Sequence, residues 1–252
     1  MAMTKWWREV RRRLGVAAAA GLCVASSPCA AALAVDVGHT LAAPGATSAR
    51  GRSEFAFNLD LARTLARALE DRGFPVRLIN EDGLIASLQA RPQAASGTDF
   101  LISVHHDSVS EHELRPWVWE GQTLNYNDDF AGHSLFVSRD NPDTARSILC
   151  ARIIGARLQR MGFVPTHKNG RRRAYADTQH AVHYYDGLAV LRHARMPAVL
   201  FEAGVIKNRE EELLLRDEAR IRLMADGIAT GLAACLRNGL PADGEAEADA
   251  RP

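Results

Sequence analysis

Hydrophobic positions recur along the chain with two alternating periods. Helical spacing predicts long helices over residues 53–73 and 141–162, and one or two helices over residues 208–239. Short apolar runs typical of buried strands lie at residues 32–37, 75–80, 99–105, 133–138 and 196–205. Because parallel strands need crossover helices between them, this alternation predicts an α/β fold: a single domain with a mostly parallel twisted sheet and helices on both faces.

Capping residues mark where the long helices should begin and end. Ser53 is expected to cap the first helix, which Gly73 ends. Asn141 is expected to cap the second, with Pro142 at its first position and Gly162 at its end. These signals agree with the apolar periodicity, so the helix boundaries follow from two independent features.

The two ends of the chain differ in composition from its middle. Basic residues precede an apolar run from about residue 14 to residue 25, and Ala30 and Ala32 stand as in an A-x-A cleavage site, which predicts a signal peptide over residues 1–32. That run is shorter than the roughly 20 residues of a membrane span. We therefore expect a periplasmic or secreted protein without a stable membrane span after cleavage. A domain over residues 33–238 and a polar, disordered tail over residues 239–252 would remain.

The net charge of the chain bears on whether it binds nucleic acid, and its cysteines bear on whether it contains a disulfide. With 31 basic and 30 acidic residues the formal net charge is +1, so we expect no nucleic-acid partner. Loss of the signal would leave Cys150 and Cys235. In an oxidising compartment these two could form a disulfide or remain as two buried thiols.

Ionisable residues follow several of the predicted strands. Ligands of open α/β sheets collect at the carboxyl ends of the strands. Each such residue also has a structural explanation: a strand-end histidine can simply be hydrogen-bonded, Glu54 suits the helix dipole, and Glu202 could meet an arginine. The candidates at this edge are His39 in AVDVGHT, where Gly38 would let the backbone turn, His105 and His106 after LISV, Glu202 within AVLFEAG, and Glu54 at the start of the first helix.

Taken together, these residues form a set that suits one zinc ion. Two histidines and one carboxylate commonly hold a catalytic zinc and leave a fourth position for water. Zinc lowers the pKa of that water toward about 7 and polarises the carbonyl that it attacks. A further carboxylate can then take the proton of the water and deliver it to the leaving nitrogen.

The order of the motifs AVDVGHT, SEFAFNLDLARTLARALEDRG, LISVHHDS and MPAVLFEAGVIKN resembles the zinc-dependent N-acetylmuramoyl-L-alanine amidases of the type-3 family. The family's first strand usually ends D-P-G-H-G-G, a Glu opens its first long helix, and S-I-H-A-N and V-E-x-G-F-x-x-N end two later strands. The resemblance implies that His39, Glu54 and His105 are zinc ligands, with His105 favoured over His106. It implies that Glu202 is the general base and acid, and that Asn208 caps the final helix.

The implied function is hydrolysis of the amide between N-acetylmuramic acid and L-alanine in peptidoglycan by an exported monomer, with a regulatory activator protein as a further partner. Alternatives are a zinc carboxypeptidase or other amidohydrolase acting on wall peptides, and a non-catalytic wall-binding relative. The chain departs from the family at Val37, Thr40, Asp107 and Val205, none of which is a ligand or the base.

Two stretches, residues 107–132 and 163–187, show neither period, and loops of that length are usually functional or mobile. The first contains Trp117, Trp119 and Tyr126. Its tryptophans could line a glycan groove, or the stretch could be a surface loop with a small aromatic cluster. The acidic residues that could instead fill the open zinc position as a regulatory plug are Glu111, Glu113 and Glu120.

Overall fold

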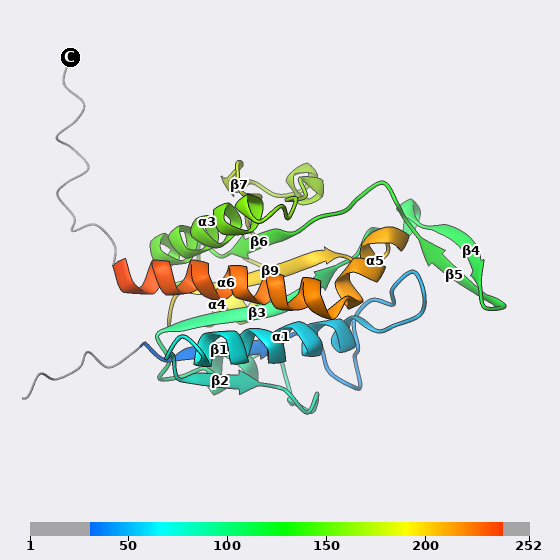
Figure 1. The fold of residues 1–252 in the computed structure, drawn as a ribbon. Helices are drawn as coiled ribbons and strands as arrows, with labels where there is room; N and C mark the ends of the chain where they lie inside the picture. The colour runs from blue at the N-terminus through cyan, green and yellow to red at the C-terminus, as the bar shows by residue number, and fades with distance from the viewer. Residues whose placement is uncertain (1–30, 239–252) are drawn as a thin grey trace, which may run out of the picture.

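The computed structural model describes residues 31–238, which form a seven-stranded sheet between two layers of helices (Figure 1). The strand order is β2-β1-β3-β9-β6-β8-β7. Four neighbouring pairs are parallel, and β6 with β9 and β7 with β8 are antiparallel. The strands are β1 (Leu33–Val37), β2 (Val76–Ile79), β3 (Phe100–Asp107), β6 (Ser134–Val137), β7 (Tyr175–Asp177), β8 (Val182–Tyr184) and β9 (Ala198–Val205). This confirms the predicted single α/β domain with a mostly parallel sheet.

Helices cover both faces of the sheet, as the alternation predicts. The larger apolar core lies under α1, α3 and α6, and the smaller one lies under the short helices α2 and α4. The C-terminal segment forms two helices, because the chain breaks at Asp217 between α5 and α6. The helices are α1 (Glu54–Glu70), α2 (Ala90–Ala94), α3 (Thr144–Arg160), α4 (Ala189–Arg192), α5 (Arg209–Arg216) and α6 (Glu218–Asn238), with single turns η1 (Glu111–Glu113) and η2 (Lys168–Arg171).

The start of α3 differs from the prediction. The helix begins at Thr144, and the carboxylate of Asp143 caps it by accepting from the Arg146 amide at 3.0 Å. The predicted cap at Asn141 is wrong, because the Asn141 amide instead donates to carbonyls near α4, including that of Met196 at 3.0 Å. A long-range contact therefore overrides the local capping signal.

Both unassigned stretches contain strands. Residues 107–132 form the antiparallel hairpin of β4 (Arg115–Trp119) and β5 (Gln122–Tyr126), which projects from the end of the sheet where β3 and β9 terminate (Figure 1). Residues 163–187 supply β7 and β8 at the edge of the main sheet. The predicted loops are thus partly ordered as strands of three to five residues.

A disulfide joins the middle of α3 to the end of α6. Cys150 and Cys235 are both buried, with their Cα atoms 5.3 Å apart. This decides between the two interpretations of the cysteines in favour of the disulfide. The predicted signal peptide, except for Ala31 and Ala32, and the predicted tail over residues 239–252 lie outside the described residues.

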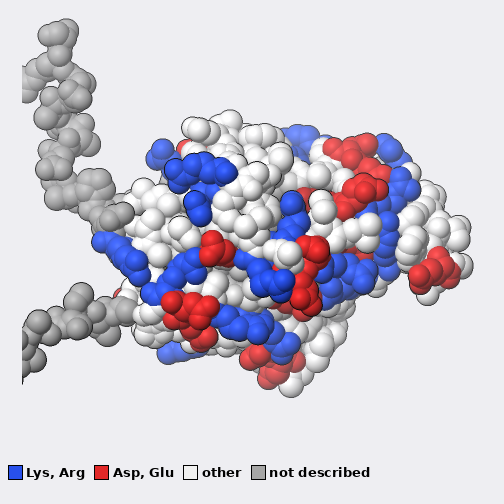
Figure 2. Space-filling view, viewed as in Figure 1, with Lys and Arg blue, Asp and Glu red and all other residues white. Residues whose placement is uncertain are grey.

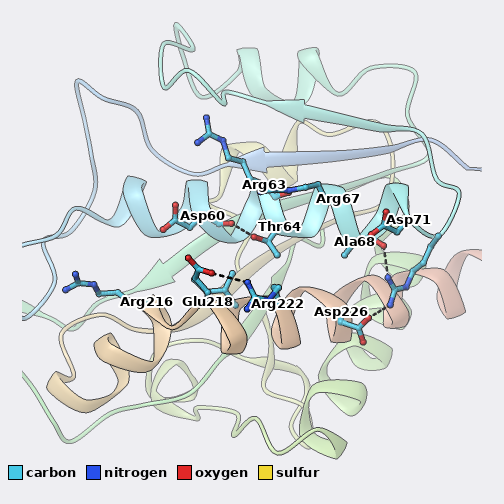
Figure 3. Close-up of a pocket in the computed structure, with 12 residues that line it drawn as sticks. Asp60, Arg63, Thr64, Arg67, Ala68, Asp71, Arg216, Glu218, Arg222 and Asp226 are labelled. Atoms are coloured by element: carbon cyan, nitrogen blue, oxygen red, sulfur yellow. Dashed lines mark hydrogen bonds and ion pairs between the residues drawn. The ribbon is translucent and has the colours of Figure 1, made fainter.

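Charged side chains of both signs interleave along the surface of α1 and α6 (Figure 2). A groove of about 830 Å³ lies between these two helices; the ion pair of Arg72 with Asp226 crosses it, and that of Arg222 with Glu218 lies along α6 (Figure 3). None of the predicted site residues lines it. Among residues 31–238, no helix has the length and apolar character needed to cross a membrane.

Candidate metal centre

Three of the predicted site residues converge at the carboxyl edge of the sheet. His39 follows β1, His105 lies near the end of β3, and Glu54 is the first residue of α1. One ligand atom from each lies within 4.8 Å of the others. The convergence follows from topology, because β1 and β3 are parallel neighbours and so end at the same edge.

The Glu54 carboxylate lies between the two imidazoles. Its Oε1 atom is 2.9 Å from Nε2 of His39 and 3.1 Å from Nδ1 of His105, while Oε2 accepts from the Ala46 amide at 3.2 Å. Burial alone would raise the pKa of Glu54, but hydrogen bonds with His105 and His39 lower it well below its usual value. The site therefore favours an ionised carboxylate next to two imidazole nitrogens.

Two glycines make room for this cluster. A Cβ atom on Gly38 would lie 2.4 Å from the ring of His105, and one on Gly45 would lie 2.5 Å from Oε2 of Glu54. The left-handed backbone is at His39, with φ of 67°, rather than at Gly38. The interpretation of Gly38 as the residue that turns the backbone is thus wrong, because its small size serves to admit the His105 ring.

The neighbouring His106 points to the other face of β3. Its Nδ1 lies 2.8 Å from Oδ1 of Asn58 on α1, and burial lowers the pKa of His106 to about 3. Asn58 also donates to the carbonyl of Gly38 at 3.2 Å. Alternation along the strand therefore gives the two adjacent histidines different surroundings, and only His105 lies in the cluster with Glu54.

Glu202 lies beside His105, in register with it across the pair β3 and β9. Its Oε2 atom is buried and has no hydrogen-bond partner among residues 31–238. Burial, and then the charges of Asp107 and Glu54, raise the pKa of Glu202 well above its usual value, against the opposing charge of Lys168. Within the described part of the chain, the cation that acts on this carboxylate is thus a lysine rather than an arginine.

Sequence reasoning missed the neighbours of Asp107. Lys168 donates to Oδ1 of Asp107 at 2.9 Å, and Asn169 donates to Oδ2 at 2.9 Å. Both come from η2, within a stretch that was not assigned to any element. The one available signal was the acidic residue at position 107, where the family carries Asn.

The hairpin holds its aromatic residues against the chain itself. Arg50 lies over the rings of Trp117 and Trp119, at 5.3 and 4.8 Å from their centroids, and Nε1 of Trp117 donates to a backbone carbonyl at 2.9 Å. Glu113 pairs with Arg171 at 2.8 Å. None of the three glutamates considered as a plug belongs to the converging group found in residues 31–238.

The donor set fits a zinc ion. Two imidazole nitrogens and one carboxylate are typical ligands of a catalytic zinc. Gly38 and Gly45 allow the side chains of this cluster to pack closely, and Oε2 of Glu202 is a buried oxygen that has no partner among residues 31–238 and could accept from a reactant.

Two histidines and a glutamate at the carboxyl edge of an α/β sheet have the donor set of a catalytic metal site. Residues 33–234 match the family Amidase_3, described as N-acetylmuramoyl-L-alanine amidase, and the chain belongs to this family.

A curated relative is the probable cell wall amidase LytH of Staphylococcus aureus, which is 26% identical over 202 residues, 79% of this chain and 56% of that protein. The chain thus spans about half the length of the curated relatives that it matches.

Solved structures support the fold. Ami1, an N-acetylmuramyl-L-alanine amidase from Mycobacterium smegmatis, matches with a TM-score of 0.68 and 19% identity over 84% of this chain and 100% of that one. The CwlD amidase of Clostridioides difficile, solved in complex with the GerS lipoprotein, matches with a TM-score of 0.63 and 21% identity over 82% of this chain and 98% of that one.

Proposed function

We propose that this chain is an exported zinc hydrolase that cleaves the amide between N-acetylmuramic acid and L-alanine in peptidoglycan. The observation that carries the proposal is the convergence of His39, Glu54 and His105 beside the unpartnered carboxyl of Glu202. Membership of the amidase family supplies the substrate class. The buried disulfide suits an oxidising compartment, which supports export.

His39, Glu54 and His105 would hold the zinc ion, which when bound would supply Lewis acidity toward the scissile carbonyl. The ionised Glu54 would offset part of the metal charge. Glu202 would accept the proton of the attacking water and pass it to the leaving nitrogen of L-alanine. Burial raises the pKa of Glu202, so in this site the carboxylate holds a proton taken from water more readily than an exposed glutamate would.

Replacement of Glu202 tests the proposal most directly. We expect Glu202→Ala to bind zinc like the wild type and to lose peptidoglycan hydrolysis by roughly 10²- to 10⁴-fold. Glu210→Ala, in the exposed first turn of α5, is the matched control and should keep both properties. A Glu202→Ala variant with near wild-type turnover would refute the role of Glu202.

Identification of the products separates the proposed reaction from carboxypeptidase action. Amidase action frees peptides that begin with L-alanine and leaves bare glycan, whereas a carboxypeptidase shortens the peptide at its other end. Mass spectrometry of digested peptidoglycan distinguishes these products. Shortened peptides that are still attached to glycan would overturn the amidase assignment, and the absence of any product together with the absence of zinc would favour a wall-binding role.

A regulatory partner and the oligomeric state are further parts of the proposal. The CwlD amidase was solved in complex with a lipoprotein, which supports the proposal that a second protein binds this chain. We propose a monomer that such a partner would activate. Size-exclusion chromatography with light scattering tests the first point, and capture from a cross-linked cell envelope followed by activity assays with the purified partner tests the second.

A further inference from the structure

The backbone turn that carries His39 is held by two buried side chains, Arg91 and Asn80. The Arg91 guanidinium donates to the carbonyls of Val37, at 2.6 Å, and of His39. The Asn80 amide donates to the same two carbonyls, at 2.7 Å each. The carbonyl groups on either side of Gly38 therefore each accept from both side chains.

Arg91 is itself fixed in place by a buried ion pair. Its side chain is 4% exposed, and it donates to Oδ1 of Asp36 at 2.7 Å. Asp36 is fully buried in β1, and its other oxygen accepts from the hydroxyl of Ser103 in β3 at 2.6 Å. Because a charged, hydrogen-bonded pair of this kind has a specific geometry, the guanidinium cannot easily move away from the turn.

The turn needs such support because its backbone is uncommon. His39 has a φ of 67°, which residues other than glycine rarely adopt. That conformation brings Nε2 of His39 to 2.9 Å from Oε1 of Glu54. A return to the extended region would redirect the imidazole, so the cluster depends on how firmly the turn is held.

We propose that Arg91 and Asn80 are positioning residues that hold the His39 turn and so orient its imidazole toward Glu54 and His105 before a metal binds. This inference rests on the metal site of the proposed function and adds the residues that shape it. Groups that orient metal ligands typically change metal affinity by about 10- to 100-fold when they are removed.

Two variants remove the donors by different routes. Arg91→Met keeps the length of the side chain but donates nothing, and Asn80→Gly removes the amide while tolerating the left-handed φ of 61° at that position. We expect NMR spectra of the metal-free variants to differ from the wild type in two ways. The amide–Hα coupling constant of His39, which depends on φ, should change, and the backbone amides of the turn should exchange with solvent faster. Zinc titration against a chelator should show affinity lowered by about 10-fold or more.

Arg72→Met is the matched control. The Arg72 guanidinium also donates to a backbone carbonyl, that of Ala68 at 2.7 Å, and also pairs with a carboxylate, that of Asp226, but it lies at the C-terminal end of α1. We expect this variant to lose stability while the His39 signals and the zinc affinity stay within about twofold of the wild type, because its contacts do not reach a metal ligand.

The outcomes separate the inference from the proposed function. If Asn80→Gly and Arg91→Met fold, keep the wild-type His39 signals and bind zinc as the wild type does, the positioning role is wrong. If Arg91→Met does not fold, Asn80→Gly alone decides. A wild-type protein that hydrolyses no peptidoglycan refutes the proposed function, whereas the His39 signals of the metal-free variants still support or overturn the positioning role.

Discussion

The two halves of the sheet on either side of β9 treat their buried polar groups differently. In the half formed by β2, β1 and β3, these groups are hydrogen-bonded to one another: Arg91 to Asp36, and His106 to Asn58. In the half formed by β6, β8 and β7, two histidines are buried with no partner for either ring nitrogen among residues 31–238. The buried histidine of the first half has a side-chain partner, whereas these two histidines of the second half have none, although other polar groups there, such as Asn141, are hydrogen-bonded.

The second half accommodates its histidines among aromatic rings. His133, just before β6, lies 6.1 Å from the ring of Phe201, and His183 in β8 lies 4.4 Å from the ring of Tyr175, measured between centroids. Burial lowers the pKa of each histidine to about 4, so both are neutral at pH 7. The helix α3 that covers this half is tied to α6 by the disulfide.

The comparison teaches that the buried polar side chains next to the candidate ligand atoms are paired with one another. A metal site needs its donors in fixed positions, and directional contacts supply that. His133 and His183 lie away from the cluster, and aromatic rings surround them instead. Substitutions around β2, β1 and β3 should therefore alter zinc binding, and substitutions around β6, β8 and β7 should alter stability.

The largest effect on zinc binding is expected for Glu54→Gln. The amide keeps the shape of the side chain but removes the charge that faces two imidazoles, so zinc affinity should fall by more than about 100-fold, beyond what loss of an orienting group costs. Peptidoglycan hydrolysis should be lost with it. Isothermal titration with zinc measures the affinity, and thermal melts of the metal-free protein should show only a modestly lower midpoint, because the Glu54 carboxylate also pairs with His39 and His105.

Unchanged zinc affinity in Glu54→Gln would show that Glu54 is not a ligand. A large loss of stability without metal would instead mean that this half of the sheet uses Glu54 to hold the fold. Either result would break the proposed division between the two halves.

The disulfide gives the second prediction. Replacing Cys150 and Cys235 together by alanine removes a cross-link between residues 85 positions apart, which should lower the free energy of unfolding by about 2–5 kcal/mol. Zinc affinity should be unchanged, because the link lies in the helical layer. Urea unfolding and zinc titration of the same preparations check both statements. Weakened zinc binding in a variant that is fully folded would contradict the statement about zinc affinity.

Much of the first half could be predicted from sequence alone. The apolar strands and the helix after them have strong periodic patterns, and parallel strands must end at one edge, so His39, His105 and Glu54 could be expected to meet. The roles of these three residues as ligands stay predictions. What the sequence could not indicate was the support behind them, because Arg91 and Asp36 are 55 positions apart and no local pattern relates them.

The second half and the hairpin were harder to predict for a physical reason. β7 and β8 have three residues each, too few to display an alternating pattern. The Trp residues of β4 are held by Arg50, which precedes them by more than sixty positions, so neither partner signals the contact. Short strands and distant cation–π pairs are set by tertiary context rather than by local preference.

Acid stability gives a prediction whose effect is absent at neutral pH and grows only as the pH falls. The unfolded chain binds a proton at each histidine near pH 6.5, whereas folded His133 and His183 resist protonation down to about pH 4. Between these values the unfolded state holds more protons, so these two groups should lower stability as the pH falls from 6.5 toward 4, by about 1.4 kcal/mol per pH unit for each histidine.

His183→Leu isolates this contribution. The variant fills a similar volume but cannot bind a proton, so the slope of unfolding free energy against pH should flatten by about one proton between pH 6.5 and 4. His106 on the other half and the carboxyl groups titrate in both proteins and cancel in the difference. Urea unfolding of the metal-free wild type and variant at several pH values measures the two slopes. Equal slopes would mean that His183 takes up a proton as readily in the folded state as in the unfolded state, and the contrast between paired and unpaired buried histidines would then fail at that residue.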